Sequence, residues 1–219
     1  MKYSQNPLLY LLEKYPNKPW DWKFISNNPN ITIEYYTTHP DKPWSWSWIS
    51  QNSNITMEDI ERNPEIPWRW NMISHNKNLT MDFIEKYPNE DWDWFEISQN
   101  SNITMEDIEN HPDEPWDWFS MSSNPNITME FVNKYPEKEW WFKYISSNSN
   151  ITMKDIENNP DKPWDWEYMS HNPNLTMEMI DKNPDKPWDW IAISINDNIT
   201  MEDIKKHLDK PWECGYISQ

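Results

Sequence analysis

The chain has 219 residues, among them 18 Trp, 12 Met and 10 Tyr, and its net charge is −18. Few aliphatic residues and a high net charge are typical of disordered chains, but the large aromatic and methionine side chains can supply a core instead. The composition excludes other classes, because no run of about 18 apolar residues exists to span a membrane, and a single Cys and a single Gly exclude an internal disulfide and a glycine-rich phosphate loop.

A repeat of 24 residues runs through the sequence. An anchor tryptophan recurs without insertion, and a second tryptophan follows it two residues later in seven repeats, whereas Phe142 and Cys214 take that place in the other two. The anchors are Trp20, Trp44, Trp68, Trp92, Trp116, Trp140, Trp164, Trp188 and Trp212. We therefore predict an all-α chain, an α-solenoid of nine short helix-turn-helix repeats. Its predicted parts are one array over 1–219, made of a helical segment over 1–15, eight repeats over 16–207 and a partial repeat over 208–219.

The first predicted element is a leucine-rich helix over residues 8–15. In each repeat a tryptophan helix follows. Pro43 suits the first turn of such a helix, and Asp41 just before it is a candidate N-cap. At about 100° per residue, Trp44 and Trp48 lie on one side and Trp46 on the opposite side. A helix with two apolar flanks fits a stacked array with a neighbour on each side.

A short loop, Asn52-Ser53-Asn54, follows the tryptophan helix. Asn tolerates the left-handed backbone region better than most residues, so it is expected to turn the chain in place of glycine. Asn in one register of every repeat also predicts a hydrogen-bonded ladder between repeats.

The next element is a threonine-capped helix of about eight residues. Thr56 is a good N-cap, and Asp59 three residues later resembles a capping box. Ile55 and Ile60 occupy the two positions of a hydrophobic staple, and Pro64 ends the helix. A β-solenoid is the alternative, because Trp-x-Trp alternates and Trp favours strands. Two prolines per repeat, the capping residues and the lack of Gly favour helices.

The threonine-capped helices alternate with a period of 48 residues, which suggests that pairs of repeats were duplicated. The third residue after the threonine is acidic in one set and large and apolar in the other. The sets are Asp59, Asp107, Asp155 and Asp203, and Tyr35, Phe83, Phe131 and Met179.

The chain closes in a predicted tryptophan helix over residues 216–219. Cys214, just before it, replaces the second tryptophan of the last repeat and is interpreted as a degenerate repeat position rather than a nucleophile. Residues 8–12 are nearly all Leu, and no threonine-capped helix follows the last repeat. Apolar ends of this kind favour self-association.

Two columns of residues are candidate binding sites. The acidic column lies in the first turn of the threonine-capped helices, where it either steers a basic partner or forms a solvated face that stabilises the helix start. The tryptophan column either forms an aromatic platform or packs in the core, and we favour the core. The acidic candidates are Glu58, Asp82, Glu106, Glu130, Glu178 and Glu202, with Glu34 in the same register and Lys154 interrupting it; the tryptophan candidates are Trp46, Trp70, Trp94 and Trp118.

No catalytic, metal or cofactor site is predicted. The five histidines fall in two repeat registers and lack the spacing of metal ligands, and no carboxylate pair is unique in a uniform repeat. Eight Asn-[Ile/Leu]-Thr triplets have the form of glycosylation sequons, but residues 1–6 lack a secretion signal. We therefore interpret the triplets as turns with N-caps and expect a soluble intracellular protein.

The motif Asn-Pro-Asp-Lys-Pro-Trp-Asp-Trp, followed by Asn-x-Asn-Ile-Thr-Met-Glu-Asp-Ile, resembles the tandem tryptophan-rich repeat proteins encoded by giant DNA viruses of amoebae. The resemblance covers residues 16–219 and implies a viral or host-interaction context, with the host cytoplasm or the virion as location. It carries no catalytic residues.

The expected function is a non-enzymatic scaffold that binds a protein partner, and the negative charge favours a basic one. Two alternatives stay open. One is a self-associating structural component of an assembly. The other is binding of single-stranded nucleic acid through Trp stacking, which the negative charge disfavours. No membrane association is expected.

Overall fold

The computed structural model describes residues 6–213 and 215, and every helix or strand assigned in these residues is an α-helix. The chain forms two compact units, residues 1–103 and residues 104–219. The boundary lies directly before an N-cap threonine of the repeat. The single array over 1–219 stays a prediction. The predicted closing helix over 216–219 and Cys214 lie outside the described residues.

Threonine-capped helices and tryptophan helices alternate along each unit. In the first unit the threonine-capped row consists of α1 (Pro7–Lys14), α3 (Ile33–Thr38), α5 (Met57–Arg62) and α7 (Met81–Lys86), and the tryptophan row of α2 (Trp22–Ser26), α4 (Trp46–Ser50), α6 (Trp70–Ile73) and α8 (Trp94–Gln99). In the second unit the threonine-capped row consists of α9 (Met105–Asn110), α11 (Met129–Lys134), α13 (Met153–Asn158), α15 (Met177–Lys182) and α17 (Met201–Lys206), and the tryptophan row of α10 (Trp118–Met121), α12 (Phe142–Ser147), α14 (Trp166–Met169) and α16 (Trp190–Ser194). The first helix, α1, is capped by Asn6 instead of Thr.

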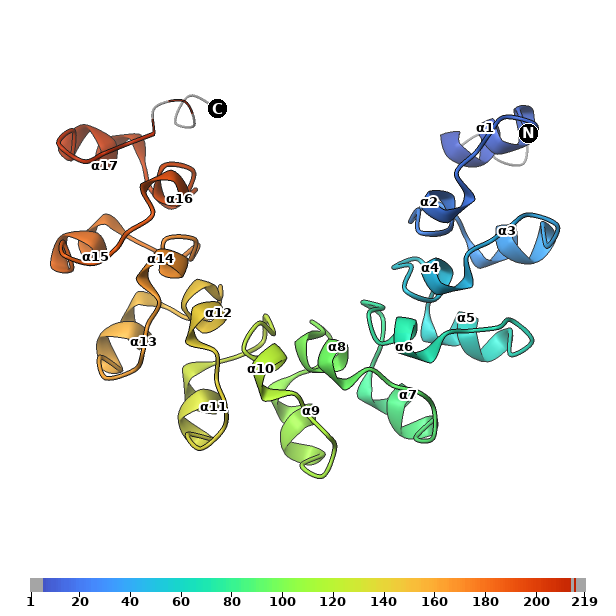
Figure 1. The fold of residues 1–219 in the computed structure, drawn as a ribbon, viewed down its shortest axis with the longest axis horizontal. Helices are drawn as coiled ribbons and strands as arrows, with labels where there is room; N and C mark the ends of the chain where they lie inside the picture. Colours follow the sequence, from blue (N-terminus) through green and yellow to red (C-terminus); the bar gives the residue numbers. More distant parts are fainter. Residues whose placement is uncertain (1–5, 214, 216–219) are drawn as a thin grey trace. The chain divides into compact units, whose positions relative to one another are not determined.

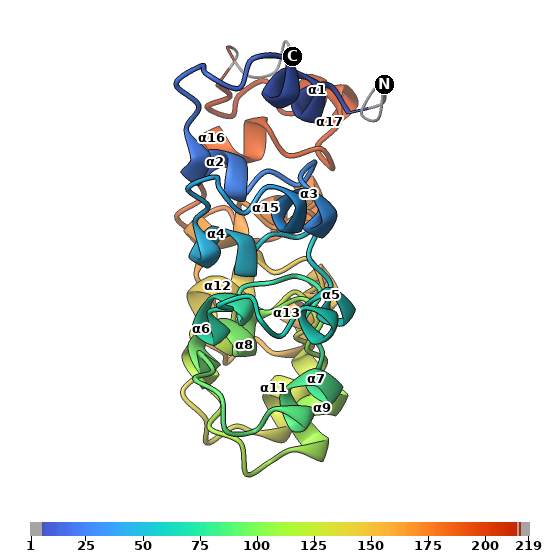
Figure 2. The same cartoon turned by 90° about the vertical axis from the view of Figure 1, so that its right-hand side faces the viewer.

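The helices of each unit stack in two rows, one of each kind (Figures 1 and 2). Within the tryptophan rows, α2 packs on α4, α4 on α6, and α12 on α14. Stacking of short helical hairpins, each of which contacts its neighbours, defines an α-solenoid. The predicted helical-repeat fold is therefore confirmed, and the β-solenoid alternative was wrong.

The threonine-capped helices begin as the sequence predicts. Thr56 accepts a hydrogen bond from the backbone N–H of Asp59 at 3.1 Å, and the Asp59 carboxylate accepts the Thr56 N–H at 2.9 Å, which completes a capping box. Ile55 and Ile60 are both buried, as a hydrophobic staple requires. The helix ends at Arg62, so it has six residues rather than about eight.

The 48-residue alternation follows from the third residue of these helices. In α5, α9, α13 and α17 it is an Asp that closes a capping box. In α7 and α11 it is Phe83 and Phe131, whose rings are buried and cannot return a hydrogen bond, so only the threonine bond remains. The two kinds of repeat thus place the same position either at the surface or in the core.

Replacing Thr56 with Ala is expected to lower the free energy of unfolding by about 1 kcal/mol, because an N-cap donor is left without its acceptor. The same change at Thr80, which accepts one bond from the Phe83 N–H at 3.3 Å, is expected to cost less. Urea unfolding followed by circular dichroism compares the two variants. A larger loss at Thr80 would contradict the role of the capping box.

The tryptophan helices begin later than predicted. The helix α4 starts at Trp46 with Ser45 at its N-cap, so the prediction that Pro43 lies in its first turn and Asp41 caps it was wrong. The predicted flank shared by Trp44 and Trp48 is wrong for the same reason, because Trp44 precedes the helix. In five of these helices the N-cap residue is an Asp that stands between the anchor and the second tryptophan, and its side chain accepts backbone N–H groups of the first turn. These helices are α2, α8, α10, α14 and α16.

The anchor tryptophan lies before the helix because its side chain reaches back to the preceding helix. The indole N–H of Trp44 donates to the carbonyl of His39, the C-cap residue of α3, at 2.8 Å. All nine anchors donate to the residue five positions earlier, at 2.7–2.9 Å. Each anchor thereby ties the end of a threonine-capped helix to the next tryptophan helix.

Rows of serine and asparagine join neighbouring repeats through their backbones. The Ser50 hydroxyl accepts the N–H of Arg69, the N-cap residue of α6, at 3.0 Å. The Asn76 amide donates to the carbonyls of Ser50, Asn52 and Ile55 at 3.0–3.2 Å. The predicted asparagine ladder is therefore confirmed. The predicted left-handed turn was wrong, since no described residue has a positive φ.

Candidate interaction surfaces

The acidic column lies at the second helical position of the threonine-capped helices, and every member is exposed. Half of the predicted acids pair with a cation on their own helix. Glu178 lies 2.9 Å from Lys182 and Glu202 lies 2.8 Å from Lys206, and Glu58 pairs with Arg62. Exposed pairs at this spacing stabilise a helix only slightly. The column is therefore partly neutralised and not a continuous negative stripe.

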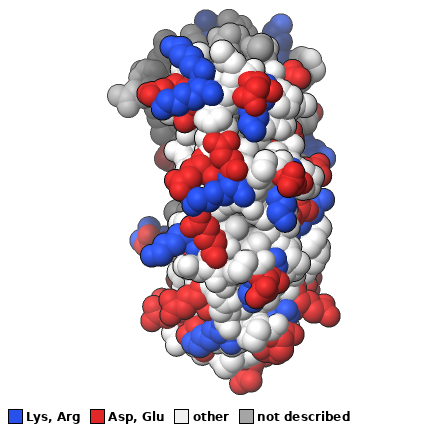
Figure 3. All heavy atoms as spheres, turned by 90° about the vertical axis from the view of Figure 1, so that its left-hand side faces the viewer, with Lys and Arg blue, Asp and Glu red and all other residues white. Residues whose placement is uncertain are grey.

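Lysines also link neighbouring threonine-capped helices. Lys134 of α11 lies 2.7 Å from Glu109 of α9, and Lys182 of α15 lies 2.8 Å from Glu157 of α13. The hydrogen bond to Glu109 raises the pKa of Lys134. On the side of the second unit where α13, α15 and α17 lie, carboxylates and lysines are interspersed (Figure 3).

Two predicted acids share a groove in the second unit, between α9 and α11. Glu106 and Glu130 line it together with the Glu109–Lys134 pair, and its volume is about 290 Å³. Met105 and the buried ring of Phe131 add apolar walls. Three carboxylates against one ammonium leave the groove negative, and the apolar atoms suit the methylene chain of a long basic residue.

The second tryptophan of a repeat packs against the anchor of the next repeat. The rings of Trp70 and Trp92 lie 5.3 Å apart, and those of Trp118 and Trp140 lie 5.3 Å apart, both edge to face. This arrangement is favourable for aromatic pairs. The second column is half-buried at each of its described positions, whereas Trp44, Trp68, Trp116 and Trp164 of the anchor column are buried.

Lysines of the following repeat cover several of these rings. The ammonium of Lys138 lies 4.6 Å from the ring centre of Trp118, and that of Lys186 lies 4.9 Å from the ring centre of Trp166. Trp70 is different, because it lines a groove of about 320 Å³ in the first unit with Tyr87, Glu90 and two prolines. Among the predicted tryptophans, Trp70 and Trp118 therefore lie in different surroundings.

A cluster of exposed and half-buried aromatic residues was not predicted from the sequence. We define the aromatic patch as Phe119 of α10, Trp141 at the N-cap of α12, Lys143 and Tyr144 of α12, and Tyr168 of α14. Phe119 and Tyr144 are 43% and 36% exposed. The available signal was Trp141, which stands in a register that other repeats fill with Asp, Ser, Arg or Glu.

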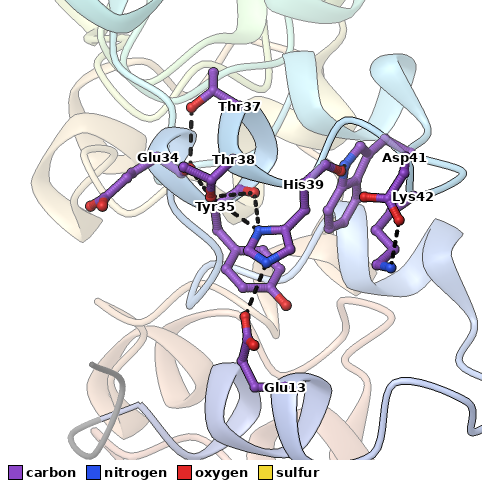
Figure 4. Close-up of polar contacts among 9 residues, drawn as sticks. Glu13, Glu34, Tyr35, Thr37, Thr38, His39, Asp41 and Lys42 are labelled. Atoms are coloured by element: carbon purple, nitrogen blue, oxygen red, sulfur yellow. Dashed lines mark hydrogen bonds and ion pairs between the residues drawn. The ribbon is translucent and has the colours of Figure 1, made fainter. Parts of the chain in front are cut away.

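Several of the histidines lie near carboxylates. His39 is an example, since its Nε2 lies 3.0 Å from Glu13 of α1 and its Nδ1 lies 3.0 Å from the Tyr35 carbonyl (Figure 4). His207 repeats this geometry with Asp181 of α15 at 2.9 Å and the Asp203 carbonyl at 2.7 Å. In the described part of the chain, no group of three or more His, Cys, Asp or Glu is placed to hold a metal ion.

His207 predicts a dependence of stability on pH. The hydrogen bond to the Asp203 carbonyl and the contact with Asp181 raise its pKa. A raised folded-state pKa adds stability that is fully present below the unfolded value of about 6.5 and is lost as the pH rises through the folded value. Asn occupies the register of His207 in three other repeats. We therefore expect His207→Asn to remove the decrease in the free energy of unfolding that His207 causes between pH 5.5 and 8.5, measured by urea unfolding. An equal decrease in both proteins would contradict the assignment.

No family model, curated protein or solved structure matches the chain. The resemblance to repeat proteins of giant viruses therefore stays a prediction. No helix in residues 6–213 has the length and apolar character needed to cross a membrane. The fold places the chain in the class of helical-repeat proteins.

Proposed function

We propose that the protein is a non-enzymatic scaffold that binds a basic protein partner along its threonine-capped helices. The groove between α9 and α11 is the observation that carries the proposal. It combines Glu106, Glu109 and Glu130 with apolar walls, and its one cation, Lys134, is paired. The net charge of −18 attracts a basic partner at long range and repels phosphate backbones.

The groove recognises a basic side chain in two ways. The carboxylates of Glu106 and Glu130 attract the terminal charge, and Met105 and Phe131 contact the methylene chain. Repeat proteins bind across several units, so similar contacts at neighbouring repeats add to one another.

The test uses fluorescein-labelled octalysine as the probe and its anisotropy as the measurement. The double variant Glu106→Gln/Glu130→Gln is expected to bind the peptide roughly two- to tenfold more weakly, because two exposed charge contacts are lost. The weakening is expected to be smaller at high salt, where exposed charges are screened.

The control is Glu114→Gln/Glu137→Gln, which removes the same charge from exposed positions in the loops after α9 and α11. The proposal predicts a smaller loss of affinity for this pair. An equal loss would show attraction to the net charge alone, and no binding by the unchanged protein would remove the proposed function.

Self-association is the second candidate, and two exposed apolar residues favour it. Ile195 is 55% exposed at a register that is polar in other repeats, and Leu208 is 75% exposed where eight other repeats have Pro. Exposed apolar side chains in place of polar ones are typical of contact surfaces. Light scattering over a concentration series, with Ile195→Gln/Leu208→Pro as the control, tests this. A concentration-independent monomer would exclude it.

A further inference from the structure

The aromatic patch includes one of the N-cap positions without a side-chain capping bond, which α12 shares with α4 and α6. Trp141 occupies the N-cap of α12 and makes no side-chain capping bond there, whereas Asp117 and Asp165 cap the helices before and after it. An indole has no oxygen to accept the free N–H groups, so the helix start is less stable. A residue that departs from the local preference of its position is typical of a functional site.

The rings of the patch form a connected surface. Trp141 stacks on Phe119 with ring centres 4.2 Å apart and planes at 20°, and it meets Tyr144 at 83°, also at 4.2 Å. Tyr144 then contacts Tyr168 edge to face at 6.5 Å. Three successive tryptophan helices of the second unit thus each supply part of one surface.

The patch already holds a cation. The ammonium of Lys143 lies 4.2 Å from the ring centre of Tyr168 and 6.0 Å from that of Trp141. The hydrogen bond to the Tyr168 side chain, followed by the nearby carboxylates of Asp165 and Glu167, raises the pKa of Lys143. Aromatic faces attract cations through their negative π surface, and nearby carboxylates add to that attraction.

We propose that Phe119, Trp141, Tyr144 and Tyr168 form a docking surface for an arginine side chain of a protein partner. A guanidinium is planar and weakly hydrated, so it stacks on aromatic faces better than an ammonium does. Lys143 lies nearest Tyr168, and the guanidinium is received at the other end of the patch, formed by the exposed Phe119 and the half-buried Trp141. This docking surface lies on the tryptophan helices and is therefore a different site from the acidic groove between the threonine-capped helices α9 and α11.

The test is a titration with tetra-arginine, tetra-lysine and tetra-citrulline peptides, followed by the indole N–H signals in two-dimensional ¹⁵N NMR. The signal of Trp141 is identified by its loss in Trp141→Asp. Tetra-arginine is expected to shift this signal, tetra-lysine less so, and the neutral tetra-citrulline least. Equal shifts with tetra-citrulline and tetra-arginine would overturn the proposal.

Trp141→Asp is the decisive variant, because Asp is the repeat's own capping residue and is expected to preserve α12. If tetra-arginine binds at the patch, Trp141→Asp should weaken its binding about two- to fivefold, because one aromatic ring is lost. If tetra-arginine is attracted only by the net negative charge of the protein, the added carboxylate would tighten its binding instead. Unchanged or tighter binding would therefore overturn the docking surface, even where the octalysine experiment supports the acidic groove.

Lys143→Ser is an independent test of the docking surface. Serine is suited to this position, since Ser47 occupies the same register in another repeat. Removing the resident ammonium relieves repulsion, so tetra-arginine should bind more tightly. Unchanged or weaker binding would contradict an arginine ligand.

Discussion

Replacing Trp164 with Ala is expected to lower the free energy of unfolding by about 3–5 kcal/mol. Trp164 is 8% exposed, its ring meets that of Phe142 edge to face at 5.3 Å, and its indole N–H donates to the Asn159 carbonyl at 2.8 Å. The substitution leaves a cavity and a carbonyl without its donor. Urea unfolding of the whole chain gives the change in stability, and hydrogen exchange shows whether α12 to α14 open first.

The matched control for Trp164 is Trp166, two residues later. Trp166 is half-buried and contacts Trp188 at 5.2 Å, so Trp166→Ala is expected to cost clearly less. Trp164→Phe keeps a ring but loses the N–H and part of the volume, so its cost is expected to be smaller than that of Trp164→Ala. Equal losses for Trp164→Ala and Trp166→Ala would contradict the anchor role.

The second large effect is expected for Asn76→Ala, at about 3 kcal/mol. The Asn76 side chain is fully buried and shares its amide hydrogens among three backbone carbonyls, and its oxygen accepts the Asn78 N–H at 2.9 Å. Buried polar groups left without a partner cost about 1–3 kcal/mol each, and these losses are not additive. In the described residues no buried side-chain nitrogen or oxygen lacks a partner, so the structure has no ready replacement.

Asn78→Ala is the control for the ladder, because that amide is partly exposed although it donates to Ser53 and Ile55 at 2.8 and 2.9 Å. Water can replace these bonds, so a loss of about 1 kcal/mol is expected. Asn76→Asp keeps the acceptor and removes the donors. If Asn76→Asp were as stable as the unchanged protein in urea, the ladder would not support the stack.

The residues around each Thr show how much of the fold was accessible from the sequence. Thr56 and Asp59 interact within one helical turn, so the N-cap, the capping box and the all-α class followed from local chemistry. The 24-residue period predicted stacking because a short hairpin cannot bury its apolar face alone. The alternation at Phe83 and Asp59 was also visible, since burial and capping need different residues.

The surfaces were harder to predict, because they combine residues from different repeats. Glu106 and Glu130 were predicted as members of a uniform column. Only the three-dimensional structure shows that they share a groove between α9 and α11, while Glu178 and Glu202 pair with lysines. The aromatic patch was missed because Phe119, Trp141 and Tyr168 stand in different registers.

The amino-acid sequence alone specified the helices, their threonine caps and their repetition, because those depend on residues within about five positions of one another. The tertiary structure decided where the tryptophan helices begin, since the backbone N–H of Ser45, the N-cap residue of α4, donates to the Ser26 hydroxyl of the preceding repeat at 3.0 Å. It also decided which side chains meet between repeats. Such contacts join residues 19–26 positions apart, and their geometry depends on how one hairpin packs on the next.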